Sequence, residues 1–266
     1  MGNRIRHFTA ANPGYMTLEG TNQYLLGKDE ITVVDVALSS RANLDGIIEQ
    51  AAAMGGKIEK ILLTHIHSDH CGGALALKKR SGAKLGVSRL RAGYVGGEDF
   101  TYGDDDEIPY DGGRLKVVHT PGHESGHCCF YEPELRDLLT GDHILGRGTT
   151  VIPPPDGDMA RYIQSLEKLL GLKMRRLLPG HGPVVEDPYG KIREYIDHRM
   201  LREKMVLNCL RQGDQTISAI TARIYTDTPA ALQSVAQLSV EAHLIKLINE
   251  KRVRREGGRY ILAPGT

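Results

Sequence analysis

The chain has 266 residues and 40% of them are hydrophobic, which allows one large domain or a main domain with a smaller one. It contains no apolar stretch of membrane-spanning length, and the N-terminal MGNRIRHFTAANPGYM lacks the apolar core of a signal peptide, so we expect a soluble cytoplasmic protein that makes no membrane contact. The formal net charge is only +1, but residues 191–266 carry 13 Lys and Arg against 8 Asp and Glu, whereas residues 1–190 carry 21 against 25. This asymmetry hints at a separate basic module without by itself indicating nucleic-acid binding.

Short apolar runs rich in β-branched residues recur through the first part of the chain and predict strands. They cover residues 22–27, 31–36, 60–64, 83–87, 115–120, 127–132 and 138–142. Helical patterns lie between some of them, at 42–54, 72–80 and 158–172, and Asp158 is a candidate N-cap for the last. Because strands and helices are interspersed without strict alternation, we predict a mixed α/β layer architecture rather than a doubly wound parallel sheet.

The composition changes near Tyr189. A long helix is predicted over 190–212, followed by helices over 216–225 and 229–250 and by a hairpin over 252–262 that turns at Gly257-Gly258. Three helices and a hairpin are the element order of a winged-helix module, whose third helix usually reads DNA. We therefore divide the chain into a domain over 1–189 and a winged-helix-like domain over 190–266.

Three histidines and an aspartate occur in the stretch THIHSDHCGG, directly after a predicted strand. His65 and His67 are two residues apart on extended backbone, so both can point at one metal. Asp69 and His70 would face the other side of the same loop and could hold a second metal. The two glycines that follow allow the chain to bend tightly into a helix.

Further metal-binding side chains follow later strands. His123, Asp142 and His181 each come after an apolar run and have a glycine beside them. Imidazole and carboxylate at the mouths of successive strands suit zinc and similar metals. We expect His119 to be structural and His143, next to Asp142, to point away.

The four cysteines are interpreted as free thiols in a reducing compartment, because their spacing fits neither disulfides nor a zinc finger. They are Cys71, Cys128, Cys129 and Cys209. The role of Cys71, beside the histidine cluster, stays open.

The order H-x-H-x-D-H, TPGH, TGD and PGHGP resembles the metallo-β-lactamase fold superfamily over about residues 1–185. The resemblance implies a four-layer αββα sandwich. It also implies one metal held by His65, His67 and His123, a second held by Asp69, His70 and His181, and Asp142 bridging the two.

A narrower resemblance covers nearly the whole chain. The segments NPGYMTLEGTNQYLLG, DMARYIQSLEKLLGL and YIDHRMLREKMVLNCL resemble the β-lactamase-like protein 2 group, which carries a C-terminal winged-helix-like domain. The chain departs from the superfamily where Asp-Thr-Gly is usual, because it has Asp35-Val-Ala. Asp35 is expected to hydrogen-bond to a metal ligand from behind.

The predicted activity is metal-dependent hydrolysis with two Zn²⁺ ions, although other divalent transition metals are possible. A water between the two metals would lose its proton and attack a carbonyl carbon or a phosphorus, with Asp69 as a possible proton acceptor. His127 could contact the substrate or make a hydrogen bond behind the ligands. His67 favours zinc hydrolysis over the iron redox chemistry of flavodiiron proteins, which have an acidic residue there.

Two substrate classes stay open. One is a small-molecule ester or thioester, and the other is single-stranded RNA, which the narrower resemblance implies and Arg252, Arg254, Arg255 and Arg259 of the hairpin would support. The scarcity of aromatic residues, 5% with no Trp, weighs against RNA. A third possibility is that the C-terminal module binds nucleic acid or forms a homodimer; our own expectation is that residues 190–266 shape access to the metal site.

Overall fold

The computed structural model describes residues 5–213 and 215–265, and these form two compact units. The first unit comprises the chain up to Thr120, residues 126–149 and residues 172–189. The second comprises residues 121–125, 150–171 and 190 to the C-terminus. One junction therefore coincides with the expected boundary at 189/190, while two earlier segments join the C-terminal part. The division into domains at that single point remains a proposal.

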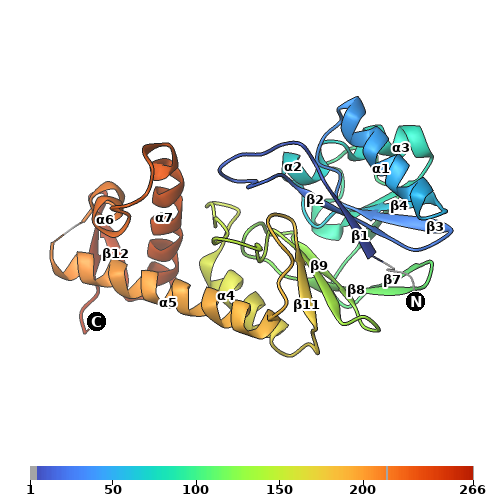
Figure 1. The fold of residues 1–266 in the computed structure, drawn as a ribbon. Helices are drawn as coiled ribbons and strands as arrows, with labels where there is room; N and C mark the ends of the chain where they lie inside the picture. Colours follow the sequence, from blue (N-terminus) through green and yellow to red (C-terminus); the bar gives the residue numbers. More distant parts are fainter. Residues whose placement is uncertain (1–4, 214, 266) are drawn as a thin grey trace. The chain divides into compact units, whose positions relative to one another are not determined.

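The first unit contains a six-stranded sheet in the order β1-β2-β3-β4-β5-β6 (Figure 1). Its strands are β1 (Ile5–Thr9), β2 (Asn22–Leu26), β3 (Glu30–Val34), β4 (Lys57–Leu62), β5 (Lys84–Ser88) and β6 (Phe100–Tyr102). β1, β2 and β3 are antiparallel, whereas β3 to β6 are parallel. The carboxyl ends of β3 and β4 therefore lie at the same edge of the sheet.

A second sheet of the same unit has the order β11-β10-β9-β8-β7. Its strands are β7 (Glu107–Tyr110), β8 (Gly113–His119), β9 (Cys128–Glu132), β10 (Asp137–Gly141) and β11 (Arg176–Pro179). β10 and β11 are parallel and the other pairs are antiparallel. As a result, the end of β8, the start of β9 and the ends of β10 and β11 share one edge.

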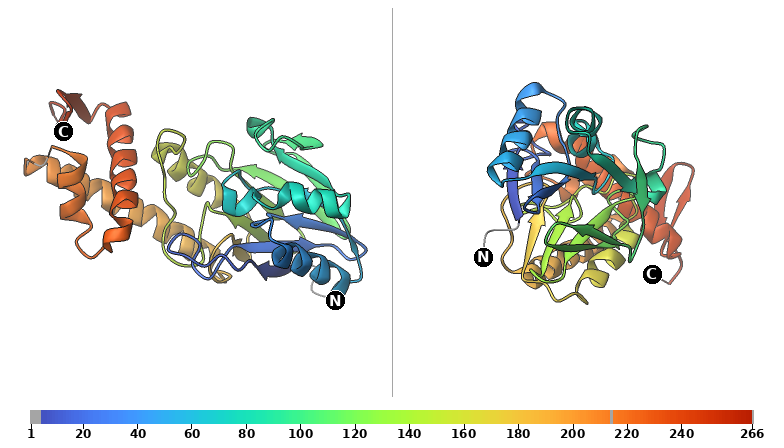
Figure 2. Two further views of the ribbon diagram at one scale, coloured as in Figure 1. Left: turned by 90° about the horizontal axis from the view of Figure 1, so that it is seen from above. Right: turned by 90° about the vertical axis from the view of Figure 1, so that its right-hand side faces the viewer.

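Two layers of core hold this unit together. Apolar side chains of both sheets, such as Leu62 and Phe130, pack face to face between them. The other face of the first sheet packs against α1 (Arg41–Ala53) and α3 (Ala74–Ser81), which lie on that side in both figures (Figure 2). A short 3-10 helix, η1 (Arg89–Arg91), follows β5.

The second unit is mainly helical. It contains α4 (Met159–Leu169), most of α5 (Pro188–Arg211), α6 (Ile217–Ile224), η2 (Ala230–Leu232), α7 (Gln233–Asn249) and the hairpin β12 (Val253–Glu256) and β13 (Arg259–Leu262). Buried side chains of α5, α6, α7 and the hairpin form one apolar cluster. Asp158 caps α4 as predicted, because its carboxylate accepts a hydrogen bond from the Arg161 amide.

Most predicted elements are present with shifts of one to three residues at their ends, and the predicted glycine turn joins β12 to β13. The histidine-rich stretch differs from expectation, because Asp69 and His70 lie on a one-turn helix, α2 (Ser68–Cys71), rather than on an open loop. The third predicted helix is split, since η2 precedes α7. Within the described part of the chain, no helix combines the length and apolar character needed to span a bilayer.

Candidate metal centre

The strand ends carry the predicted metal-binding residues. Asp35 follows β3, and His65 and His67 follow β4 at the same sheet edge. In the second sheet, Asp142 follows β10 and His181 follows β11, two neighbouring parallel strands. Parallel pairing thus places side chains that are distant in sequence at common edges.

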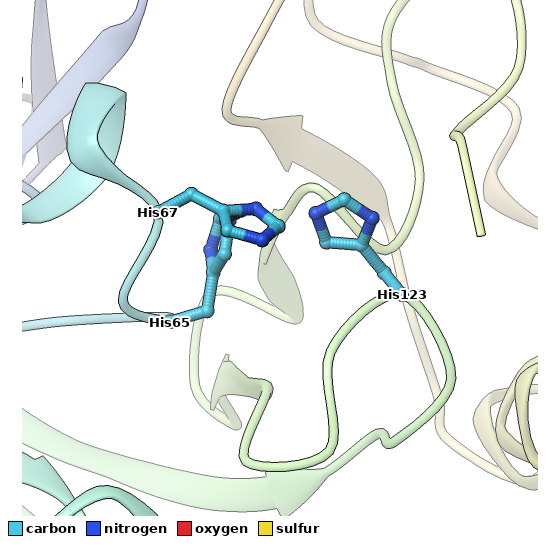
Figure 3. A group of neighbouring side chains, drawn as sticks. All are labelled: His65, His67 and His123. Carbon is cyan, nitrogen blue, oxygen red and sulfur yellow. Dashed lines mark hydrogen bonds between the residues drawn. The ribbon is translucent and has the colours of Figure 1, made fainter. Parts of the chain in front are cut away.

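One group of donors consists of His65, His67 and His123, whose coordinating atoms all lie within 4.8 Å of one another. Figure 3 shows the three imidazole rings turned toward a common point. The Nε2 of His65 is 3.0 Å from the Nδ1 of His67. The Nδ1 of His123 donates to the carbonyl of Val151 at 2.7 Å, which leaves its Nε2 without a proton and able to bind a metal.

The other group consists of Asp69, His70, Asp142 and His181, again with donor atoms within 4.8 Å. The Nε2 atoms of His70 and His181 are 3.2 Å apart, and each is within 3.2 Å of Asp142 Oδ1. Asp69 Oδ2 lies 3.3 Å from His181 Nε2. Two nitrogens and two carboxylates around one point are a donor set suited to zinc or a related transition metal.

Hydrogen bonds behind the ligands set the tautomers. Asp35 is buried, and its Oδ2 accepts from the Nδ1 of His70 at 2.8 Å and from the Thr64 hydroxyl at 2.8 Å. The same hydroxyl accepts from the Nδ1 of His65 at 3.0 Å. The carbonyl of Gly20 accepts from the Nδ1 of His181 at 3.1 Å. In each histidine the Nε2 is thereby left to face the donor group.

The charges of the second group depend on one another. Burial alone would raise the pKa of Asp142, but the charges of His70 and His181 outweigh it and hold that pKa well below its usual range. Burial alone would lower the pKa of His181, but Asp142 and Asp69 raise it to about 9. Without a metal, the group therefore holds protons where a cation would sit, and metal binding must displace them.

All seven predicted ligands fall into the two groups, and Asp35 occupies the position expected for it behind the ligands. The bridging role of Asp142 stays a proposal, because its carboxylate is placed with the second group only. His127 is fully buried and lies outside both groups; its Nδ1 is 2.9 Å from the Thr120 hydroxyl and its ring centroid 5.1 Å from that of His65.

Two further histidines and the four cysteines lie outside the donor groups. His119 ends β8 and His143 is buried, and neither belongs to a donor group. Cys128, Cys129 and Cys209 are buried free thiols, and Cys71 is partly buried with its thiol toward the Ile66 carbonyl at 3.2 Å.

The supporting positions that the sequence did not reveal are Thr64 and the carbonyls of Gly20 and Val151. Thr64 directly precedes His65, and this adjacency is the one signal that could have pointed to it. Gly180 has a separate role, because a Cβ at this position would lie 2.6 Å from His70 Cε1. Only glycine allows the loop before His181 to approach so closely.

The fold and the donor groups together define a two-sheet protein whose strand ends carry side chains positioned to bind metal ions. Residues 16–181 match the metallo-beta-lactamase superfamily, and residues 216–260 match the beta-lactamase associated winged helix domain. The chain belongs to the metallo-beta-lactamase superfamily and is a hydrolase of that superfamily.

Curated relatives confirm the narrower resemblance. A beta-lactamase-like protein 2 homolog from Drosophila melanogaster is 36% identical over 91% of this chain and 87% of its own length. A homolog of the same name from Caenorhabditis elegans is 34% identical over 94% of this chain and 86% of its own length. The atrochrysone carboxyl ACP thioesterase of Aspergillus fumigatus is 33% identical over 78% of this chain and 65% of its own length.

A solved structure confirms the predicted fold class, an αββα sandwich of the metallo-beta-lactamase type with a C-terminal winged helix. A metallo-beta-lactamase family protein from Thermus thermophilus superimposes with a TM-score of 0.81 at 23% identity, over 97% of this chain and 98% of its own. At this identity the likeness concerns the fold alone.

Proposed function

We propose that this hydrolase uses two zinc ions to cleave an ester or thioester of a small molecule. The observation that carries the proposal is the pair of donor groups, in which the hydrogen bonds of His65, His70, His123 and His181 leave their Nε2 atoms facing a common region. Zinc bound there would lower the pKa of a coordinated water from ~15.7 to about 7 and polarise the scissile carbonyl.

Asp69 is the proposed proton acceptor. Burial alone would raise the pKa of Asp69, but the hydrogen bond from His181 and the charge of His70 outweigh burial and lower this pKa. The carboxylate is therefore ionised at neutral pH. Its side chain keeps 26% of its surface exposed, which leaves it accessible to a proton from the attacking water. For His127, complete burial and the contact with Thr120 favour a hydrogen bond behind the ligands over direct contact with substrate.

The substrate class is supported by a relative and by the C-terminal charges. The Aspergillus relative is named a thioesterase, which makes thioesters the first substrates to test. The helix in the position of a recognition helix, α7, has one lysine, Lys246, and this side chain is buried and paired with Glu203 at 2.6 Å and Glu250 at 2.7 Å. A helix face without exposed cations is a poor reader of phosphates.

Two arginines at or beside the hairpin also form ion pairs with acidic side chains. Arg252 pairs with Glu203 at 2.7 Å, and Arg254 pairs with Glu256 at 3.0 Å. Arg252 lies outside the strands of the hairpin, because β12 begins only at Val253. Single-strand ribonuclease activity is the alternative that the experiment must address, and homodimer formation stays a prediction that light scattering can check.

The decisive experiment assays zinc-loaded protein on acyl thioesters, lactones and a fluorescent single-stranded RNA, alongside metal analysis. We expect about two zinc ions per chain and turnover of thioesters or esters. Replacing His123 with alanine should remove metal and activity, whereas His119→Ala, four residues earlier and outside both donor groups, should retain both. Zinc below roughly a tenth of an equivalent after reconstitution would contradict the site, and turnover of RNA alone would favour the ribonuclease.

A further inference from the structure

A cavity of about 460 Å³ lies within the second unit. Three segments line it: the stretch 121–125, the loop 154–158 with the start of α4, and one face of α7. Its volume is within the ~300–1,000 Å³ that small-molecule sites usually have. The α7 residues that line it, Ala242, Ile245 and Lys246, follow the i, i+3, i+4 spacing of a single helix face.

Hydrogen bonds hold the lining segments in place. The Asp158 amide donates to the Gly122 carbonyl at 2.8 Å, and the Ser165 hydroxyl of α4 donates to the Pro121 carbonyl at 2.8 Å. Gly122 has a φ of +141°, and a Cβ there would lie 2.3 Å from the Cα of Tyr162. The stretch 121–125 is therefore packed tightly against α4, so the cavity is formed before any ligand arrives.

The lining is mostly aliphatic. Its apolar members are Pro121, Pro154, Pro155, Met159, Ala242 and Ile245, and none of the described lining residues is aromatic. Ile245 keeps 40% of its surface exposed, so its side chain is accessible to a ligand in the cavity. Aliphatic walls without a stacking ring suit a flexible hydrocarbon chain better than an aromatic group.

The charged groups around the cavity already have partners. Lys246 is paired with two glutamates, Asp156 accepts from the Ser125 amide at 3.3 Å, and Asp158 caps α4 with Arg161 3.8 Å from its carboxylate. Each charged side chain of the lining already has a hydrogen bond or an ion pair, so a neutral chain can enter without competing for these groups.

The cavity is next to a proposed metal ligand along the chain. Gly122 and Ser125 line it, and His123 lies between them on the same packed stretch. The Cα atoms of Gly122 and His123 are about 3.8 Å apart, because they are consecutive residues. A substrate whose reacting carbonyl lies at His123 could therefore extend its chain into this cavity.

We propose that this cavity binds the aliphatic acyl chain of the substrate, with Ile245 of α7 as a wall of the subsite. The proposal rests on the proposed ester or thioester hydrolysis. It assigns the winged-helix part of the chain a role in substrate selection, through a neutral apolar contact instead of phosphate recognition.

The test compares acyl thioesters of one thiol, from acetyl to decanoyl, in zinc-loaded wild type and in Ile245→Trp, which fills the cavity. In the wild type, kcat/KM should rise with chain length by up to about fourfold per methylene buried. Ile245→Trp should remove this rise, with a loss of about tenfold or more on the decanoyl thioester and less than about twofold on the acetyl thioester. The matched control is Leu201→Trp, which should behave as wild type. Leu201 is an aliphatic residue of α5 that is 56% exposed and does not line the cavity.

A binding measurement separates this proposal from the proposed function. Octanamide, which is neither ester nor thioester, should bind the zinc-loaded wild type in ligand-observed NMR and should bind Ile245→Trp weakly. Such binding without any ester or thioester turnover would refute the proposed function and support the subsite. Turnover that is independent of chain length, or equal losses on acetyl and decanoyl thioesters, would overturn the subsite. If Ile245→Trp fails to fold, Ile245→Ala should still flatten the chain-length dependence.

Discussion

Replacing Asp35 with asparagine should weaken metal binding at the second donor group while preserving the fold. Asp35 has a φ of +63°, and asparagine tolerates this left-handed conformation better than most residues. The amide can still accept from the Thr64 backbone N–H, now 2.7 Å from Oδ1. The NH₂ group of the asparagine, however, must then face the Nδ1 of His70 and the Thr64 hydroxyl. In the wild type, the carboxylate oxygen at this position accepts a hydrogen bond from each of these two groups.

The magnitude follows from the tautomer of His70. With a donor opposite Nδ1, the favoured imidazole carries its proton on Nε2 and cannot bind the metal through that atom. Losing a hydrogen bond of this kind behind a ligand weakens metal binding about 10- to 100-fold, or roughly 1.4–2.7 kcal/mol. His65 is affected less, because it contacts Asp35 only through Thr64.

Competition between the protein and a calibrated chelator, with one zinc equivalent added at a time, measures this effect. One zinc should bind about 10- to 100-fold more weakly in Asp35→Asn and the other should change little. Asp29→Asn, which removes an exposed carboxylate on the turn before β3, controls for the loss of one charge. Affinities unchanged at both sites would show that Asp35 does not set the His70 tautomer.

Three further outcomes follow from the structure. His67→Ala and Asp142→Asn should each reduce kcat/KM by more than about 100-fold with a near-native circular dichroism spectrum, and activity within about threefold of wild type in the second would refute the bridging role. Gly180→Ala should displace His70 and lower the zinc content, because the new Cβ would lie 2.6 Å from the ring; full zinc occupancy would argue against this crowding. Burial and neighbouring cations lower the pKa of His243 to about 3, so the folded protein takes up this proton far less readily than the unfolded chain, whose pKa is about 6.5. The contribution of His243 to the free energy of unfolding is therefore complete above about pH 6.5, and below this pH it declines by up to about 1.4 kcal/mol per pH unit. Urea unfolding at pH 5 and pH 7 should accordingly show a smaller pH dependence of stability in His243→Leu than in the wild type.

The fold class and the ligands could be predicted because each depends on a local pattern. Apolar runs marked the central strands, and donors placed directly after them marked the sheet edges. The short or exposed edge strands β1, β6 and β7 lacked such runs and were not predicted. The sequence predicts a loop for Asp69 and His70, because a single helical turn is too short to show a periodicity.

The supporting contacts and the cavity could not be predicted because they depend on tertiary packing. The carbonyls that orient His123 and His181 belong to Val151 and Gly20, and any residue type supplies a backbone carbonyl. The cavity requires stretches near residues 121, 154 and 242 to meet, and no sequence pattern connects them. The second unit likewise draws 121–125 and 150–171 from the middle of the chain, whereas composition suggested one boundary at residue 189.

The buried Glu203 changes how the charge of the C-terminal segment should be understood. Its carboxylate, with 3% of the side chain exposed, accepts ion pairs from Lys246 of α7 and Arg252 before the hairpin. Lys246 and Arg252 are thus compensated locally by Glu203 and Glu250, and the net excess of the segment comes from its other basic residues. Long-range electrostatic steering requires uncompensated surface charge and weakens with added salt. The chain as a whole has a formal net charge of only +1, so we expect its encounter with an uncharged ester or thioester to be nearly independent of ionic strength.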